Sequence, residues 1–251
     1  MKKDPRILLD LTNYRRGDIV PLPPKLAHHL INVLRIKDGT SIAIDCPQTG
    51  RKFRATLLQQ TSRPEILLSE EAPRVEVLSR VRTVAIAALK GKKLDLVCEF
   101  VSELGIPELI CWESERSIAK LPIGAPHSEK TKRWTEIARS AAQLSGSSVP
   151  TRIHLAKDID QMLELVKDLG STSDTNIVCS LAPGSLEMRE IAVQEGRVNL
   201  VIGPEGDFSE IEEQRLMGAG FIPASLGKLT MRAELATICA VAMAHGIWGE
   251  V

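Results

Sequence analysis

From residue 81 to the end of the chain, short apolar runs alternate with longer segments whose apolar residues recur at helical spacing. The runs that we expect to be strands are 83–90, 108–112, 153–156, 176–182, 198–203 and 221–227. The segments that we expect to be helices are 94–104, 131–144, 159–169, 209–218 and 234–248. Strands that alternate with helices form a mainly parallel sheet with helices on both faces. The sequence therefore predicts an α/β domain.

The region before this domain has a different pattern, with short alternating runs separated by turns at Asp38-Gly39 and Thr49-Gly50. Such runs favour antiparallel strands, which we expect at 17–23, 39–47, 48–60 and 64–71. Between the first two runs, four apolar residues fall at helical spacing, namely Leu26, Leu30, Val33 and Leu34. We therefore predict a small β-barrel crossed by a single helix within residues 25–37.

A chain of 251 residues, 43% of them hydrophobic, is long enough for two separate cores. The pattern changes in a charged segment that contains Pro73, so we predict domains at 1–73 and 74–251. Residues 1–70 hold twelve Lys and Arg against seven Asp and Glu, whereas the remainder holds 20 against 25. A basic first domain suits a phosphate-rich partner, or is simply a solvated surface. Six arginines are candidates for phosphate contacts, namely Arg6, Arg15, Arg16, Arg35, Arg51 and Arg54.

Cysteine and histidine spacing argues against a metal site or a disulfide framework. The five cysteines include no CxxC pair, and the histidines show neither HxxxH nor HExxH spacing. The first apolar stretch is only four residues long before Asp10, too short for a signal sequence or a membrane span. We therefore expect a cytoplasmic protein that has neither a metal nor a membrane anchor.

Ligands of open α/β sheets bind at the carboxyl ends of the strands, and three loops at such positions are unusual. They are 180–184, 203–207 and 226–232. The Gly-Pro-Glu-Gly sequence of the second loop either lets a ligand approach the backbone or only supplies a turn. Ser209 and Glu212 are placed to form a capping box behind it. Arg232 and Glu234, after the third loop, either bind an anion or a carbonyl oxygen, or form a surface ion pair.

Five segments, in this order, resemble those of one known family. They are HHLINVLRIKDGT, SELGIPELICWESERS, RWTEIARSAAQLSGSSVP, VIGPEGDFS and LGKLTMRAELA. The chain resembles the RsmE-type 16S ribosomal RNA (uracil-N3) methyltransferases of the SPOUT superfamily. The resemblance implies a PUA-like barrel, a trefoil-knotted catalytic domain, S-adenosylmethionine as methyl donor and a homodimer. The implied substrate is 16S rRNA or the small ribosomal subunit, methylated at N3 of a uridine.

The resemblance also implies roles for individual positions. The implied donor pocket consists of Leu181, Ala182, Gly203, Pro204, Glu205, Gly206, Leu226, Gly227 and Met231. The implied catalytic residues are Arg232, Glu234 and Glu205, with either carboxylate a candidate general base or a group that fixes loop geometry. The implied RNA contacts are Arg6, His29, Arg35, Arg51, Arg54 and Arg116.

The sequence departs from the family pattern at several of these sites. The departures are Phe100, Ser147, Ser148, Asp207, Leu229 and Leu235, and several replace basic or glycine positions. Weaker phosphate binding would change the substrate or the efficiency of the reaction. The alternatives are an RNA-binding or assembly protein with reduced or no methyl transfer, and methylation of a different RNA position.

Overall fold

The computed structural model describes residues 4–46, 51–59, 63–72, 79–125, 128–147, 150–193 and 195–249. The chain divides into two compact units, each with its own hydrophobic core. The small unit comprises Met1–Glu76 and Gly146–Val149, and the large unit comprises Val77–Ser145 and Pro150–Val251. The domain boundary expected between residues 73 and 74 lies outside the described residues.

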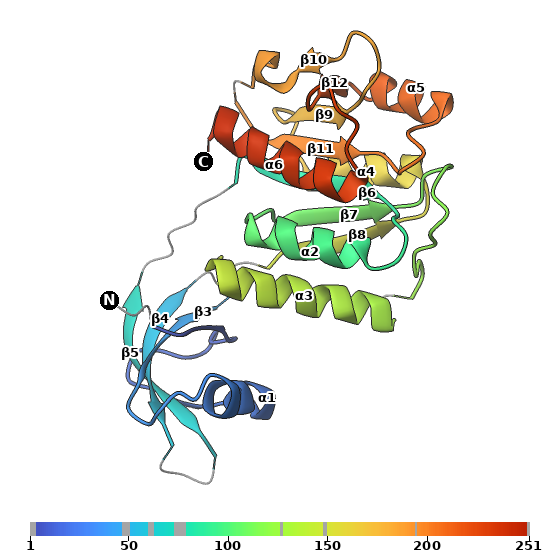
Figure 1. Ribbon diagram of the computed structural model, residues 1–251. Coiled ribbons are helices and arrows are strands. Elements are labelled where there is room, and N and C mark those ends of the chain that lie inside the picture. Colours follow the sequence, from blue (N-terminus) through green and yellow to red (C-terminus); the bar gives the residue numbers. More distant parts are fainter. Residues whose placement is uncertain are drawn as a thin grey trace. The chain divides into compact units, whose positions relative to one another are not determined.

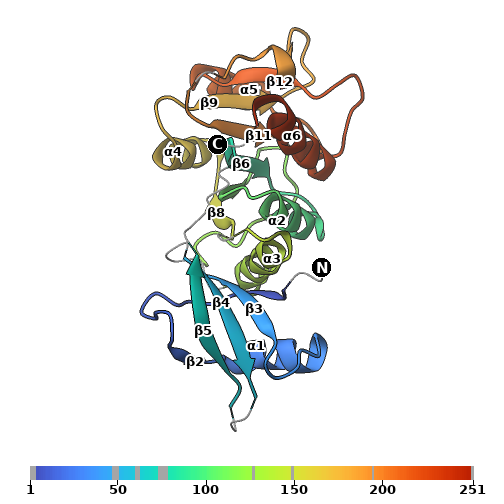
Figure 2. The same ribbon diagram turned by 90° about the vertical axis from the view of Figure 1, so that its left-hand side faces the viewer.

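The small unit contains a five-stranded sheet in the order β1-β3-β4-β5-β2. Its strands are β1 (Arg6–Leu8), β2 (Ile19–Pro21), β3 (Ser41–Asp45), β4 (Lys52–Leu58) and β5 (Glu65–Ala72). β3, β4 and β5 lie side by side and antiparallel, and β2 pairs antiparallel with β5, as expected (Figure 2). β1 is an addition, paired parallel with β3. The turn expected at Thr49-Gly50 lies outside the described residues, and closure into a barrel stays a prediction.

The helix of the small unit differs from the predicted one. An α-helical turn, α1 (Pro24–His28), continues into a π-helical turn, η1 (His29–Val33), and ends there rather than near residue 37. The N–H of Leu34 bonds to the carbonyl five residues before it, which widens the turn. As a result Leu30 is buried as predicted, but Val33 and Leu34 are exposed, because the wider turn rotates them off the expected face.

The large unit contains a seven-stranded sheet in the order β10-β12-β9-β11-β6-β7-β8, and every strand pair in it is parallel. Six strands match the predicted runs and one, β10, was not predicted. The strands are β6 (Val81–Ala87), β7 (Glu108–Trp112), β8 (Arg152–Ala156), β9 (Thr175–Cys179), β10 (Leu186–Glu187), β11 (Val198–Ile202) and β12 (Ile222–Ser225).

The five helices expected in the large unit are all present, with ends within two residues of the prediction. They are α2 (Lys93–Glu103), α3 (Glu129–Ser145), α4 (Ile159–Leu169), α5 (Glu210–Gly218) and α6 (Ala233–Trp248). α2, α3 and α6 cover one face of the sheet, and α4 and α5 cover the other (Figure 1). Alternate residues of β6 enter the two cores, with Val84 in one and Ala85 in the other. The predicted parallel sheet between two helical layers is confirmed.

α6 packs along β6 and β11 through one buried stripe. The stripe consists of Thr237, Ala240, Val241 and Ala244, at a spacing that places all four on one helix face. Small side chains there let the helix lie close to the sheet, so the start of α6 is fixed next to the carboxyl ends of the central strands. In the part of the chain that the structure describes, the apolar helices, α6 included, are too short to cross a membrane.

Candidate active site

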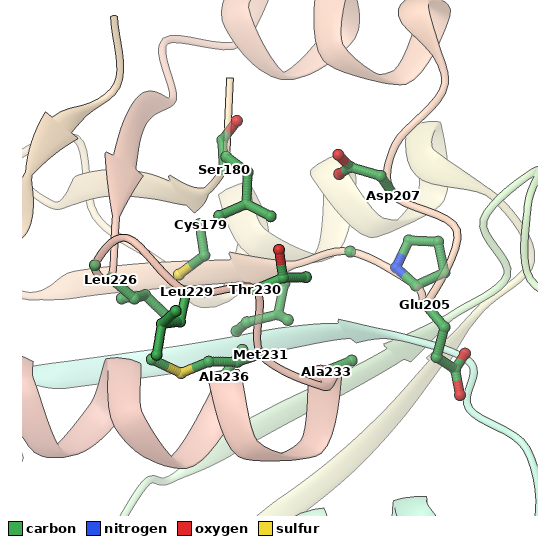
Figure 3. A pocket seen from close by; sticks show the side chains of 15 residues that line it. Cys179, Ser180, Glu205, Asp207, Leu226, Leu229, Thr230, Met231, Ala233 and Ala236 are labelled. Atoms are coloured by element: carbon green, nitrogen blue, oxygen red, sulfur yellow. The ribbon is translucent and has the colours of Figure 1, made fainter. Parts of the chain in front are cut away.

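A pocket opens where β9, β11 and β12 end, the edge at which the sequence predicted a ligand site. Its walls come from the three unusual loops and from the first turn of α6 (Figure 3). The lining residues are Cys179, Ser180, Leu181, Ile202, Gly203, Pro204, Glu205, Asp207, Leu226, Gly227, Leu229, Thr230, Met231, Ala233 and Ala236. Segments that are far apart in the sequence therefore enclose one small cavity.

Seven of the nine positions expected to bind the methyl donor line this pocket, and two do not. The seven are Leu181, Gly203, Pro204, Glu205, Leu226, Gly227 and Met231. Ala182 lies outside the lining because its N–H and carbonyl hold a tight turn, bonded to the hydroxyls of Ser180 and Ser185. Gly206 lies outside it because its carbonyl faces Arg116, whose Nη1 donates a hydrogen bond of 3.1 Å.

The remaining lining residues were not assigned from the sequence. They are Cys179, Ser180, Ile202, Asp207, Leu229, Thr230, Ala233 and Ala236. Cys179 and Ile202 are the last residues of their strands, and Ala233 and Ala236 are three apart on α6. Strand ends and the i, i+3 spacing of the helix were the available signals. The sequence interpretation relied on the glycine-bearing loops and therefore did not include these residues.

The pocket has two chemically different sides. Leu226, Met231 and Ala236 form an apolar side together with Cys179, whereas Asp207 stands on the opposite side (Figure 3). Burial raises the pKa of the Cys179 thiol to about 12, so the thiol stays protonated at neutral pH. It contributes apolar surface and not a nucleophile.

Glycine is needed in these loops for two different reasons. A Cβ on Gly203 would lie 3.0 Å from the ring of Phe208, so packing inside the protein already requires glycine there. Gly227 has a φ of +133°, a conformation that other residues rarely adopt, and open space lies where its Cβ would be. Gly203 is therefore explained by packing against Phe208 and not by the turn, and the space at Gly227 is available to a ligand.

The capping box predicted behind the second loop is present and extends further than expected. The Ser209 hydroxyl accepts from the N–H of Glu212, and the Glu212 carboxylate accepts from the N–H of Ser209. The same buried carboxylate also accepts from the Ser114 hydroxyl at 3.1 Å and from the N–H of Glu115 at 2.9 Å. One carboxylate thus fastens the loop after β7 to the loop after β11, which makes the pocket wall rigid.

Asp207 closes the second loop in an unusual backbone conformation. Its φ is +61°, one of two positive values among the described residues other than glycine. Its N–H donates to the carbonyl of Pro204 at 3.1 Å, and its Oδ1 accepts from the N–H of Phe208 at 2.9 Å. Aspartate tolerates this conformation better than most residues because its side chain bonds to the local backbone.

A group of four charged side chains lies beside the pocket. Lys93 Nζ is 2.8 Å from Glu205 Oε1 and 3.7 Å from Glu234 Oε2. The other oxygen of Glu234 is 3.6 Å from Arg232 Nε, and the Arg232 side chain is 77% exposed. Arg232 and Glu234 flank the pocket without belonging to its lining. Lys93, the first residue of α2, was missed because it stands more than 100 residues from both carboxylates in the sequence.

Lys93 sets the charge state of Glu205. Burial alone would raise the pKa of the Glu205 carboxyl, but the hydrogen bond from Lys93 and one from the Glu205 backbone N–H outweigh it and hold that pKa below its usual value. A carboxylate stabilised in this way is a weak proton acceptor at neutral pH. The geometry therefore favours a structural role for Glu205 over that of a general base.

The positions expected to bind RNA are divided between the two units. Arg116 lies in the large unit, in the loop after β7, and donates a hydrogen bond to Gly206 of the Gly-Pro-Glu-Gly loop. Arg51 and Arg54 in the small unit pair with Glu71 and Glu70, on the neighbouring strand β5. Arg6 pairs with Asp45 and bonds the carbonyl of Gly146, whereas His29 and Arg35 are exposed. Their contact with RNA stays a prediction.

Titratable side chains elsewhere do not converge on a metal site. Across the described ranges, no group of three or more His, Cys, Asp or Glu is placed to hold an ion. The buried thiols of Cys98 and Cys111 have raised pKa values because burial disfavours the thiolate.

A parallel sheet with a glycine-lined pocket at its carboxyl edge, flanked by an Arg-x-Glu pair, is the arrangement that the family resemblance implied. Comparison with known families agrees, because the RNA methyltransferase domain family matches residues 78–245, most of the large unit. The chain belongs to this family.

Relatives with established names extend the match beyond that domain. The chain is 28% identical over 230 residues to the ribosomal RNA small subunit methyltransferase E of Bacillus subtilis. This match covers 85% of this chain and 84% of the relative. It is 27% identical over 239 residues to ribosomal RNA small subunit methyltransferase E 2 of Borreliella burgdorferi, covering 94% and 95%. The RsmE-type resemblance found in the motifs is confirmed.

The fold is also shared with solved structures. A ribosomal RNA small subunit methyltransferase E from Neisseria gonorrhoeae, bound to S-adenosyl methionine, superposes with a TM-score of 0.84. The two chains are 26% identical, and the match covers 98% of each. Both units of this protein thus have counterparts in one related chain.

Proposed function

We propose that this protein transfers a methyl group from S-adenosylmethionine to N3 of a uridine in the 16S RNA of the small ribosomal subunit. The observation that carries the proposal is the pocket at the ends of β9, β11 and β12, with Arg232 and Glu234 beside it, in a chain of the RNA methyltransferase family. The related Neisseria enzyme was solved with S-adenosyl methionine bound, which supports the same donor here.

The residues of the pocket fit such a donor. Its apolar side, with Leu226 and Met231, suits an adenine ring, and the open space at Gly227 lets a ligand lie against the backbone. The opposite side carries the carboxylate of Asp207, which suits a ligand with positive charge. When bound, S-adenosylmethionine supplies a methyl group on a positively charged sulfur.

Arg232 is the residue that we assign to the reacting base. N3 of uracil carries a proton that must pass to solvent water before or during methyl transfer, and negative charge then spreads to the neighbouring carbonyl oxygens. The exposed guanidinium of Arg232, at the N-cap of α6, is free to face that charge and stabilise it. Its role is therefore electrostatic and requires no change in its own protonation.

Glu234 and Lys93 hold this guanidinium in place. Glu234 is largely buried in the first turn of α6, with one oxygen toward Arg232 and the other toward Lys93. Because its two oxygens face the two cations, we assign Glu234 to orienting Arg232 and not to removing the N3 proton. Lys93 in turn connects Glu234 to Glu205 in the loop after β11.

The finer architecture is part of the proposal. We infer that the C-terminal segment of the large unit threads a loop as a trefoil knot, and that the small unit is a PUA-like barrel that binds RNA through Arg6, Arg51 and Arg54. We further infer domains at 1–73 and 74–251 and a cytoplasmic homodimer. The family membership and the parallel sheet at the pocket support these inferences.

Methylation of ribosomal RNA tests the proposal directly. Small ribosomal subunits from a strain without this protein are incubated with the purified enzyme and S-adenosylmethionine, and the RNA is digested and analysed by mass spectrometry. We expect one new 3-methyluridine in 16S RNA, and no product with the Arg232→Ala variant. Free 16S RNA is assayed in parallel to distinguish it from the assembled subunit as substrate.

Two other outcomes would replace the proposal. Micromolar donor binding without any methylated product would favour the RNA-binding or assembly protein. A methyl group on another base or RNA would keep the enzyme class but reassign its target. The replaced positions at Phe100, Ser147, Ser148 and Leu229 motivate the first outcome, because they lie where the family usually has other, often basic, residues.

A further inference from the structure

The loop after β11 holds two carboxylates in opposite situations. Glu205 is paired with Lys93 at 2.8 Å, and its carboxylate points away from Ser180 and Thr230 (Figure 3). Asp207 lines the pocket, and its carboxylate points toward the side where Ser180 and Thr230 lie (Figure 3). Within the described part of the chain, no Lys, Arg or His lies within ion-pair distance of Asp207. The Asp207 carboxylate is therefore available to a ligand in the pocket.

The backbone does not require aspartate at this position. With φ at +61°, residue 207 has a conformation that glycine adopts without strain and asparagine tolerates well. The loop conformation can therefore form without a carboxylate at this position. What the aspartate adds is a carboxylate on the wall of the pocket.

We propose that the Asp207 carboxylate binds the ammonium group at the amino-acid end of the methyl donor. This inference rests on the proposed function and adds a recognition residue to it. S-adenosylmethionine carries a sulfonium, an ammonium and a carboxylate, and so has one net positive charge that an unpaired carboxylate complements. One oxygen of Asp207 is held by the N–H of Phe208, so the side chain is already oriented before the ligand arrives.

The two sides of the pocket agree with this orientation of the donor. The adenine ring belongs on the apolar side formed by Leu226, Met231 and Ala236. The amino-acid end then extends toward the polar side, where Asp207 stands opposite those residues (Figure 3). The ammonium is the group at that end that donates hydrogen bonds, so it is the natural partner of a carboxylate.

Calorimetric titration of three ligands tests the assignment without any methyl transfer. S-adenosylmethionine and S-adenosylhomocysteine both carry the ammonium, whereas 5′-methylthioadenosine keeps the nucleoside and lacks the amino-acid end. Asp207→Asn removes the charge and retains the shape and the tolerance of positive φ. We expect it to weaken binding of the first two ligands by about tenfold and that of 5′-methylthioadenosine by less than about twofold.

Two further variants guard against indirect effects. Asp207→Gly suits the same backbone conformation and should reproduce the selective loss. Asp168→Asn, on the exposed face of α4, is the matched control and should leave all three affinities unchanged. Thermal unfolding of each variant confirms that the fold is retained.

The remaining outcomes overturn the assignment in distinct ways. An equal loss for all three ligands would place Asp207 on the ribose, a loss for S-adenosylmethionine alone would place it near the sulfonium, and no loss would remove it from recognition. Failure of the unaltered protein to bind S-adenosylmethionine would instead contradict the proposed function itself. The two failures are therefore distinguishable.

Discussion

Charged side chains at the two edges of the large sheet differ in how many hydrogen-bond partners they have. At the amino ends of the strands, Asp174 is 1% exposed and accepts from Arg82 Nε at 2.8 Å, the N–H of Arg197 at 2.9 Å and the N–H of Ser171 at 3.0 Å. At the carboxyl ends, Arg232 is largely exposed, and the buried Oε2 of Glu234 accepts no hydrogen bond from the described residues.

This difference separates charges that hold the fold from charges that remain available to a ligand. A buried carboxylate with three donors has used its hydrogen-bonding capacity inside the protein, so nothing remains for a substrate. The carboxyl edge keeps charged groups without full partners, which is costly unless binding or catalysis uses them. Variants at the two edges should therefore affect different measurements.

The largest effect is expected at Arg232. Arg232→Ala removes the group that we propose to stabilise charge on the reacting base, and methyl transfer should fall by about 10³-fold. Donor affinity and thermal stability should hardly change, because Arg232 lies outside the pocket lining and is exposed. Single-turnover assays and calorimetry measure the two quantities. Arg215→Ala, which also breaks an exposed ion pair, is the control, and equal loss in both variants would contradict a specific role.

At the opposite edge, Asp174→Ala should act on stability alone. It leaves Arg82 and two N–H groups without their acceptor, so the free energy of unfolding should fall by about 3 kcal/mol in urea denaturation. Transfer rates per folded molecule should stay within about twofold. Asp168→Ala, an exposed aspartate on α4, should change stability by less than about 0.5 kcal/mol. A stable but inactive Asp174→Ala protein would contradict the conclusion that charges at the amino edge serve only the fold.

A Lys93 variant tests whether the charged side chains at the carboxyl edge depend on one another. Lys93→Met keeps the aliphatic stem and removes the cation that connects Glu205 with Glu234, so kcat should fall by about tenfold while the donor dissociation constant changes little. Loss of the Lys93 hydrogen bond should also raise the pKa of Glu205 toward its usual value, seen by NMR titration. Lys92→Met, one exposed residue earlier, should leave both quantities unaltered.

Sequence patterns located the elements of the large unit well because each strand and helix there is long and periodic. α4 and β7 have the bounds that their apolar spacing predicts. β1 and β10 were missed because three and two residues carry no periodicity. The π-helical turn was missed because spacing assumes an α-helix, and nothing in the letters 29–33 marks the wider turn.

The site divides along a similar line. The three loops were found because glycine and proline at strand ends are visible in the sequence, and the Ser209–Glu212 capping box follows from a local rule. Lys93 and the contact of Glu212 with Ser114 were not accessible, since they depend on which strands lie side by side. From the sequence, Asp207 was only a departure from the family pattern. The structure places it in the lining of the pocket, where its carboxylate can contact a ligand.

The smallest expected effect concerns pH and the amino edge. Glu108 starts β7 with its side chain 5% exposed, beside Arg152 and His154 on β8. Burial would raise the pKa of Glu108, but the hydrogen bonds from His154 and Arg152 hold it below its ordinary value of 4.5. Since the folded-state pKa is the lower one, its stabilising contribution is present above that ordinary value and is lost as the pH falls through the folded-state pKa.

Glu108→Gln removes this titration and leaves a neutral side chain of the same shape. The unaltered protein should therefore lose more unfolding free energy than the variant as the pH falls from about 5 to about 3, by about 1 kcal/mol. Urea denaturation at several pH values measures the difference. Methyl-donor affinity at neutral pH should be equal in the two proteins, because Glu108 lies at the amino edge, paired with Arg152 and His154, and outside the pocket lining. A shift in donor affinity would show that the two edges are coupled through β7.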